Sequence, residues 1–231
     1  MKRRRQPARH STVRHMGLLA LFVNAWLLAV PALAASDRPL RIVALGDSLT
    51  AGFMLAPSES FPAQLERALK DRGHEVEVLN AGVSGDTTSA GLARLDWAIG
   101  ADTDAVILEL GANDALRGID PAQARANLER ILDALAKRGI PVLIAGMRAP
   151  GNWGPEYETA FNAIFPELAA AGEHLLYPFF LDGVATEPSL NLDDGLHPNA
   201  KGVARIVSGI LPMAERLIER AGQRATRLGK G

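Results

Sequence analysis

The chain has 231 residues and no cysteine, which excludes disulfide frameworks, cysteine nucleophiles and thiolate metal sites. A chain of this length buries about 70% of the surface that its unfolded form exposes, so it needs neither disulfides nor a metal for stability. Its formal net charge is −1.

The first 35 residues have the organisation of a cleavable signal peptide. Basic residues without any acid precede an apolar segment over residues 17–30, and Ala32-Leu33-Ala34 has the small-x-small pattern of a signal-peptidase site. An uncleaved anchor is the alternative, because residues 16–35 just reach membrane-spanning length. The short apolar region and Asn24 within it favour cleavage. We therefore expect a periplasmic or secreted protein without a stable membrane anchor after cleavage.

The remaining chain, residues 36–231, is acidic. The leader carries six basic residues, so its removal from a chain of net charge −1 leaves about −7. An acidic domain without a basic stripe argues against nucleic acid as a partner. We expect residues 36–231 to form a single, monomeric domain with a polar, frayed tail from about Arg220.

Short apolar runs alternate with helical patterns along this part of the chain. The predicted strands cover residues 42–45, 76–79, 105–110, 141–145 and 175–177. The predicted helices follow Ser60, cover residues 92–99, run from Asp120 to Gly139, cover residues 157–171, and start at Asn199 with a kink or interruption at Pro212. This alternation predicts right-handed βαβ units, hence an α/β fold with a doubly wound five-stranded parallel sheet. By analogy with other small sheets we expect the flavodoxin-like three-layer α/β/α arrangement with strand order 2-1-3-4-5.

In such a sheet the loops after the strands meet at one edge, although they are far apart in sequence. Those after strands one, two, three and five are Gly46-Asp47-Ser48-Leu49, residues 80–86, Gly111-Ala112-Asn113-Asp114 and residues 193–199. A serine there is by itself an ordinary turn or cap residue. Together, however, these loops contain the groups needed for nucleophilic catalysis.

Ser48 requires a base before its hydroxyl becomes a good nucleophile. Of the three histidines after the leader, His74 and His174 precede strands and therefore belong to the opposite edge, which leaves His197. A catalytic histidine also needs an acceptor for its second ring nitrogen. Asp194 lies three residues before His197, and Asp193 is the competing assignment.

Ester hydrolysis further requires donors that face the developing oxyanion, each worth about 3 kcal/mol. Asn113 offers a side-chain amide after strand three, and Gly85 offers a backbone N–H that a substrate can approach closely. We expect Asp47 and Asp114 to organise their loops by local hydrogen bonds.

These four blocks, in this order, resemble those of the SGNH (GDSL) hydrolases over residues 41–217. Residues 80–95, 109–118 and 193–199 resemble the bacterial periplasmic thioesterase/lysophospholipase/arylesterase group. The resemblance implies that Ser48 is the nucleophile, His197 the general base and acid, and Asp194 the group that orients it. It also implies an oxyanion hole made by Ser48 N–H, Gly85 N–H and the Asn113 amide. Residues 115–120 match a loop that is flexible in the family, and Gly82 replaces a larger residue, which should loosen its loop.

Apolar side chains lie near the predicted mouth of the site. Met54, Leu116 and Trp153 are the candidate substrate contacts, whereas Phe179 and Phe180 fit the core better. Such a lining suits an acyl chain or an aryl ester better than a phosphate or a sugar. We expect a serine esterase that acts on small-molecule or lipid esters, with thioesters and lysophospholipids as further candidates.

Two alternatives stay open at this point. One is a carbohydrate O-deacetylase on the same scaffold, and the other is a non-catalytic module that binds lipid or glycan. No cofactor is expected. No histidine or acid cluster has metal-ligand spacing, so we expect activity to be insensitive to chelators.

Overall fold

A five-stranded parallel sheet with the order β2-β1-β3-β4-β5 forms the centre of the fold, as predicted. The structure, a computed structural model, describes residues 38–228, so the predicted signal peptide lies outside the described residues. The strands are β1 (Leu40–Gly46), β2 (Val76–Gly82), β3 (Ala105–Glu109), β4 (Val142–Ala145) and β5 (Leu175–Tyr177).

The burial of the strands follows from their sequences. The central strands β3 and β4 are buried throughout, as expected for nearly continuous apolar runs covered on both faces. The edge strand β2 alternates between buried and partly exposed residues over its first half. Strands β1 and β2 are longer than predicted because their pairing continues to Gly46 and Gly82, which are register partners.

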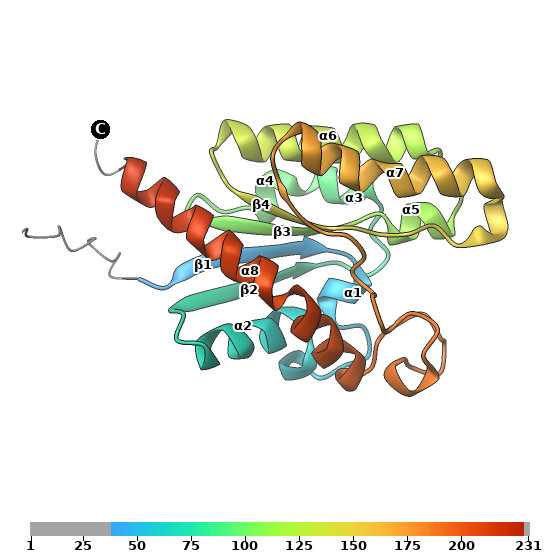
Figure 1. Cartoon of the computed structure of the whole chain (residues 1–231), viewed down its shortest axis with the longest axis horizontal. Helices are drawn as coiled ribbons and strands as arrows, with labels where there is room; N and C mark the ends of the chain where they lie inside the picture. Colours follow the sequence, from blue (N-terminus) through green and yellow to red (C-terminus); the bar gives the residue numbers. More distant parts are fainter. Residues whose placement is uncertain (1–37, 229–231) are drawn as a thin grey trace, which may run out of the picture. The chain divides into compact units, whose positions relative to one another are not determined.

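Helices cover both faces of the sheet (Figure 1). In that view α6 and α7 lie on one side of the sheet and α2 and α8 on the other. The α-helices are α1 (Ser48–Ala51), α2 (Phe61–Asp71), α3 (Thr88–Ala93), α4 (Leu95–Ala98), α5 (Ala112–Leu116), α6 (Pro121–Lys137), α7 (Pro155–Ala171) and α8 (Ala200–Leu228). Short 3-10 turns are η1 (Pro57–Glu59), η2 (Gly151–Trp153) and η3 (Pro188–Leu190). No helix within residues 38–228 combines the length and apolarity needed to cross a membrane.

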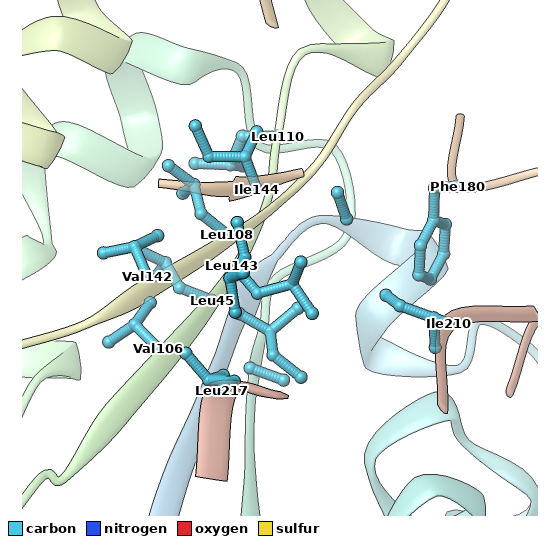
Figure 2. Close-up of a cluster of buried hydrophobic side chains, with 14 of the residues drawn as sticks. Leu45, Val106, Leu108, Leu110, Val142, Leu143, Ile144, Phe180, Ile210 and Leu217 are labelled. Atoms are coloured by element: carbon cyan, nitrogen blue, oxygen red, sulfur yellow. The ribbon is translucent and has the colours of Figure 1, made fainter. Parts of the chain in front are cut away.

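Buried side chains of the strands and of α8 fix the position of the strands (Figure 2). Leu45 of β1, Leu108 of β3 and Leu143 of β4 are at most 1% exposed. Ile210 and Leu217 of α8 are fully buried beside them. Burial of each such side chain stabilises the fold by about 1.5–3 kcal/mol. The strand ends, from which the site loops start, are therefore held on a rigid base.

Most helix boundaries arise from the predicted residues. The Asp120 side chain accepts a hydrogen bond from Ala122 N–H before α6, and Gly139 has a positive φ of 65° after that helix. Asn199 Oδ1 accepts from Lys201 N–H and Gly202 N–H at the start of α8. The single helix predicted over residues 92–99 was wrong, because Arg94 separates α3 from α4.

Helix α8 differs from the prediction in two respects. Pro212 does not interrupt it, and its flanking residues on the inner face, Leu211 and Ala214, are buried. The frayed tail predicted from Arg220 was also wrong, since the helix continues to Leu228. Its last turns are anchored: Ala221 is 3% exposed, and Arg224 Nη2 donates to Arg138 O at 3.0 Å. Burial and hydrogen bonding of this segment outweigh its polar composition.

Candidate active site

Ser48 lies at the point where the central strand β1 turns into the short helix α1. Asp47 precedes the helix as its N-cap, and its Oδ1 accepts a hydrogen bond from Leu49 N–H at 3.0 Å. This bond holds the tight turn after Gly46. Ser48 is only 9% exposed, so its hydroxyl is held in place and largely shielded from water.

His197 lies on a loop after β5 whose two ends are joined by backbone hydrogen bonds. Asn191 and Pro198 form an isolated antiparallel bridge, and Leu192 N–H donates to His197 O at 2.8 Å. Asp194 Oδ1 accepts from Leu196 N–H at 2.9 Å and from His197 N–H at 3.0 Å. The hydrogen bonds from the His197 backbone, the His197 ring and the Leu196 backbone lower the pKa of Asp194 to about 2. Asp194 is thus a carboxylate at neutral pH.

The two loops bring Ser48, His197 and Asp194 into one hydrogen-bonded line. His197 Nε2 lies 2.9 Å from Ser48 Oγ, and His197 Nδ1 lies 2.6 Å from Asp194 Oδ2. Asp194, and not the exposed Asp193, is therefore the acid that contacts the imidazole. The ring of Phe53, which follows α1, lies next to the His197 imidazole with a centroid distance of 4.5 Å.

The other two histidines lie away from this line, as predicted. His74 precedes β2, and its Nε2 is 3.5 Å from Glu215 Oε1. His174 precedes β5 at the same, amino-terminal edge of the sheet, where burial lowers its pKa.

Asn113 and Gly85 lie on loops that follow the neighbouring strands β3 and β2. Asn113 Nδ2 donates to Asp86 O at 2.9 Å and to Asp47 Oδ2 at 3.1 Å. Gly85 is exposed and has a positive φ of 88°, which only glycine adopts without strain. Its carbonyl accepts a hydrogen bond from Arg117 Nη2 at 3.0 Å. Through its hydrogen bond to Asp47, the Asn113 amide is connected to the turn that contains Ser48.

Asp47 and Asp114 are loop organisers, as predicted, and both are buried. Burial raises the pKa of Asp47 to about 6, against the opposing effect of hydrogen bonds from Leu49 and Asn113. Asp114 accepts hydrogen bonds from Thr88 Oγ1 at 2.6 Å and Thr88 N–H at 2.8 Å, and burial raises its pKa as well. Asp114 thus fixes the start of α3 relative to α5.

Two contributors, Arg94 and Glu109, were missed from the sequence, and the prediction for Gly82 was wrong. Arg94 donates to Asp86 Oδ2 at 2.6 Å and to Gly46 O at 2.9 Å, so it ties the loop after β2 to the loop after β1. Glu109 accepts from Thr50 Oγ1 at 2.7 Å. Gly82 does not loosen its loop: a Cβ there would lie 2.8 Å from Asp47 O, so glycine allows close backbone contact. These residues lie within helical or strand patterns, where their sequence pattern resembles that of ordinary core or surface positions.

Exposed apolar side chains surround this edge of the sheet. Of seven large hydrophobic side chains exposed in the described chain, six belong to segments that follow a strand at this edge. They are Phe53, Met54, Val83, Leu116, Trp153 and Leu196, which we call the apolar rim. The predicted contacts Met54, Leu116 and Trp153 are all members. Val83 and Leu196 were missed, although they lie next to the Gly85 loop and His197. Phe180 is fully buried, as predicted, whereas Phe179 is half-buried against Arg148.

The segment over residues 115–120 is tied to the η2–α7 region. Trp153 Nε1 donates to Ala115 O at 2.8 Å, and Tyr157 Oη donates to Ile119 O at 2.9 Å. A Cβ on Gly118 would lie 2.8 Å from the Trp153 ring, so glycine permits the indole to lie flush on the backbone. The start of this segment belongs to α5 rather than to a loop.

No group of three or more histidine, cysteine or acidic side chains within residues 38–228 could hold a metal ion. The arrangement that the structure does provide is a hydroxyl, an imidazole, a carboxylate and an amide at the carboxyl ends of parallel strands. Such a set of groups can transfer an acyl group without a metal.

Comparison with known proteins gives matches across this fold and site. Residues 44–205 match the GDSL-like Lipase/Acylhydrolase family. An arylesterase from Vibrio mimicus is 42% identical over 166 residues, which are 71% of this chain and 83% of the relative. The Thioesterase 1/protease 1/lysophospholipase L1 of Escherichia coli (strain K12) is 39% identical over 167 residues, 72% of this chain and 77% of the relative. The crystal structure of AlinE4, an SGNH-hydrolase family esterase, superposes with a TM-score of 0.67 at 45% identity, covering 79% of this chain and 98% of that chain.

The fold is that of the SGNH-hydrolase esterases. The chain belongs to the GDSL-like Lipase/Acylhydrolase family, and it is an enzyme with serine esterase function. The two alternatives considered for the sequence, a carbohydrate O-deacetylase and a non-catalytic binding module, are not favoured.

Proposed function

We propose that Ser48 is the nucleophile of this esterase, that His197 is its general base and acid, and that Asp194 orients His197. The observation that carries the proposal is the hydrogen-bonded line Ser48 Oγ–His197 Nε2–Asp194, with distances of 2.9 Å and 2.6 Å. Ser48 and His197 are 149 positions apart in the chain, so the fold has to bring them together. An acceptor on His Nδ1 fixes the tautomer that leaves Nε2 free to take the serine proton.

The proposed reaction has two halves. Ser48 Oγ attacks the carbonyl carbon of the ester while His197 Nε2 takes the hydroxyl proton. His197 then gives that proton to the departing alcohol, phenol or thiol, which leaves an acyl group on Ser48. A water molecule then gives a proton to His197 and its oxygen attacks the acyl carbon. His197 returns that proton to Ser48 Oγ as the bond between Oγ and the acyl carbon breaks, which releases the carboxylic acid and restores the Ser48 hydroxyl. Asp194 stays ionised and stabilises the imidazolium in both halves.

The oxyanion hole of the proposal consists of Ser48 N–H, Gly85 N–H and the Asn113 amide. Two features support it. The Asn113 amide is placed by its hydrogen bonds to Asp47 Oδ2 and Asp86 O, and one of its two N–H groups would be shared with the oxyanion; Gly85 leaves its backbone open to a ligand. Donors that are already oriented need no reorganisation when the oxyanion forms, which is the main source of their catalytic value.

The apolar rim supports an acyl chain or aromatic group as the part of the substrate that is bound. Met54, Leu116 and Trp153, at 80%, 47% and 47% exposure, are the substrate contacts of the proposal. The Phe53 ring against His197 extends this surface to the site of chemistry. Acyl and aryl esters fit best, because the apolar side chains of the rim do not suit the many hydroxyl groups of a sugar. Thioesters and lysophospholipids are further candidates.

We also propose that the enzyme works outside the cytoplasm, in the periplasm or secreted. Support comes from the sequence of residues 1–35, with its basic start, apolar centre and Ala32-Leu33-Ala34. Residues 36–231 would then be one catalytic domain that acts as a monomer and keeps no stable anchor after cleavage.

Labelling with a fluorophosphonate tests the nucleophile. The wild-type enzyme is expected to be labelled on Ser48 and to lose activity in step with labelling. Ser48→Ala should abolish both labelling and turnover while its thermal unfolding stays near that of the wild type. The matched control is Ser58→Ala at an exposed serine, which should leave both intact. Undiminished hydrolysis by Ser48→Ala would refute the assignment.

An acyl-chain series tests the substrate class. We expect kcat/KM for p-nitrophenyl esters to rise from acetate to longer acyl chains, since a longer chain covers more of the apolar rim. An acetylated glycan should be a poor substrate. A preference for the glycan over every p-nitrophenyl ester would favour the O-deacetylase instead.

A further inference from the structure

A carboxylic side chain lies directly behind the turn that carries Ser48. Glu109 is the last residue of β3 and the register partner of Gly46 in β1. Its exposure is 0%. Its Oε2 accepts hydrogen bonds from Thr50 Oγ1 at 2.7 Å and, more weakly, from Asp47 N–H at 3.3 Å. Glu109 therefore contacts both ends of the Asp47–Thr50 turn.

Gly46 leaves space for the carboxyl group of Glu109, because it has no side chain. A Cβ on Gly46 would lie 2.6 Å from Glu109 Oε2 and would also collide with Thr50 Oγ1. Any other residue at position 46 would displace the carboxyl group or the turn. The contact between Gly46 and Glu109 therefore depends on glycine at position 46.

Within the described part of the chain, Glu109 lacks the cationic partner that often accompanies a buried acid. It forms no salt bridge within residues 38–228, and its Oε1 is buried without a hydrogen-bond partner. Burial, and next the neighbouring Asp47, raise the pKa of Glu109 well above its ordinary value. An apolar residue of similar volume would avoid the desolvation cost of burying this carboxyl group. Stability alone therefore does not explain a glutamate at this position.

The contacts of Asp47 carry the influence of Glu109 onward to the reacting groups. The Asp47 N–H faces Glu109, while the Asp47 carboxylate accepts from Leu49 N–H and from Asn113 Nδ2. One buried acid thus lies at the base of a short chain of hydrogen bonds that ends at the amide proposed for the oxyanion hole. Ser48 lies within the same turn, between Asp47 and Thr50.

We propose that Glu109 is a positioning residue of the esterase, whose carboxyl oxygen fixes the Asp47–Thr50 turn and so sets the direction of Ser48 Oγ and of the Asn113 amide. The proposal rests on the functions proposed above for Ser48 and Asn113. It assigns Glu109 no contact with substrate. Its value lies in orientation, because displacement of a reacting group by about 1 Å can cost about a hundredfold in rate.

Two substitutions at Glu109 separate its acceptor oxygen from its bulk. Glu109→Gln keeps an acceptor oxygen on a side chain of the same length, so we expect kcat within about threefold of the wild type. Glu109→Met fills the same space without the acceptor, so we expect kcat to fall between about tenfold and a hundredfold with KM within about twofold. The Met variant removes the buried acid but leaves the Thr50 hydroxyl and the Asp47 N–H without their acceptor, so its thermal unfolding serves to show that the protein is folded. A merely structural glutamate would not lose kcat in the Met variant at constant KM and regain it in the Gln variant.

Thr50→Val supplies the matched variant on the donor side. It keeps the shape of the side chain but removes the hydroxyl that donates to Glu109. We expect a smaller fall in kcat than for Glu109→Met, and the double variant should be no slower than Glu109→Met alone, because both changes break the same interaction. If Glu109→Met does not fold, Thr50→Val carries the test.

The outcomes are read with kcat, KM and the rate of fluorophosphonate labelling on folded protein. Wild-type kcat in Glu109→Met, or in Thr50→Val when the former does not fold, overturns the proposal. An equal loss in Gln and Met also overturns it, because the acceptor oxygen is then not the feature that matters. Failure of the proposed function is distinct: turnover in Ser48→Ala, or labelling at another residue, would show it regardless of position 109.

Discussion

Charged side chains at the two edges of the sheet differ in how far they are buried and in whether they form ion pairs. At the amino edge, charges are partly exposed and paired: Arg41 Nε lies 2.9 Å from Glu77 Oε2, and Arg72 Nη1 lies 3.2 Å from Glu215 Oε2. At the carboxyl edge, Asp47, Glu109 and Asp114 are at most 1% exposed, and within residues 38–228 none of the three forms a salt bridge. Their partners are backbone amides, hydroxyls and the Asn113 side chain.

This difference shows where the burial of charged groups lowers the stability of the fold. Exposed pairs at the amino edge are screened by water and contribute little in either direction. Buried acids at the carboxyl edge oppose folding through desolvation, yet they orient donors in a medium where such orientation is effective. We therefore expect activity to depend on the buried acids at the carboxyl edge and not on the exposed pairs at the amino edge. The following predictions test that contrast, from the largest expected effect to the smallest.

Asp194→Asn should have the largest effect. An amide can bind the imidazole but cannot stabilise its charged form, and it favours the wrong tautomer, so we expect kcat to fall by about four orders of magnitude. The unfolding temperature should change little, because Asp194 lies in a partly exposed loop. Steady-state kinetics with a p-nitrophenyl ester measures the loss. Asp193→Asn, one residue away at an exposed position, is the matched control and should retain full activity. Equal losses in the two variants would contradict the assignment.

Asn113→Ala should come next. Loss of one oxyanion donor lowers kcat by about a hundredfold to a thousandfold, with KM nearly unchanged. The substitution also leaves Asp47 Oδ2 and Asp86 O without the Asn113 donor, so a moderate loss of stability should accompany it. Kinetics and thermal unfolding of the same sample separate the two effects. Asn152→Ala, at an exposed position before Trp153, is the control. A wild-type kcat for Asn113→Ala would remove Asn113 from the oxyanion hole.

The sequence was sufficient to predict the parts of this edge that depend on topology. Alternating strands and helices, together with the handedness of their connections, predict one edge for the loops that contain Ser48, Asn113 and His197. The strand order, which was predicted by analogy with other small sheets, was confirmed. Asp194 follows from being three residues from His197, although only the structure distinguishes it from Asp193.

The parts that could not be predicted depend on the direction of single side chains. Glu109 ends an apolar strand, and nothing in its neighbours shows that it turns inward toward Thr50. Arg94 lies in a helical pattern, yet it is the residue that separates two helices and donates to Gly46 O. The end of α8 reads as a polar tail because Arg220 and Arg224 are charged, but their partners are carbonyl groups distant in sequence. Burial partners of this kind are properties of the assembled fold.

Asp47→Asn tests the cost of burying an acid. Burial raises the pKa of Asp47 to about 6 from an ordinary 3.8, so the folded state holds the proton more tightly than the unfolded state. Asp47 therefore favours folding most at low pH, and its contribution is lost as the pH rises through about 6. Relative to Asp47→Asn, the wild type should lose up to about 3 kcal/mol of unfolding free energy between about pH 4 and pH 7. Urea unfolding of both proteins across this range measures the difference. Parallel pH profiles would show that Asp47 titrates normally.

Glu77→Gln, at the amino edge, should have the smallest effect. The pair with Arg41 has side-chain exposures of 31% and 42%, so water screens it and its loss should cost less than about 1 kcal/mol. Urea unfolding in about 0.15 M salt measures this cost, and in about 1 M salt the difference from the wild type should shrink further because the Debye length falls to about 3 Å. The kcat should equal that of the wild type, since the Glu77 side chain pairs with Arg41 at the opposite edge from Ser48. A loss of kcat in this variant would mean that the two edges are coupled through the sheet, and the division of stability and activity between them would then be wrong.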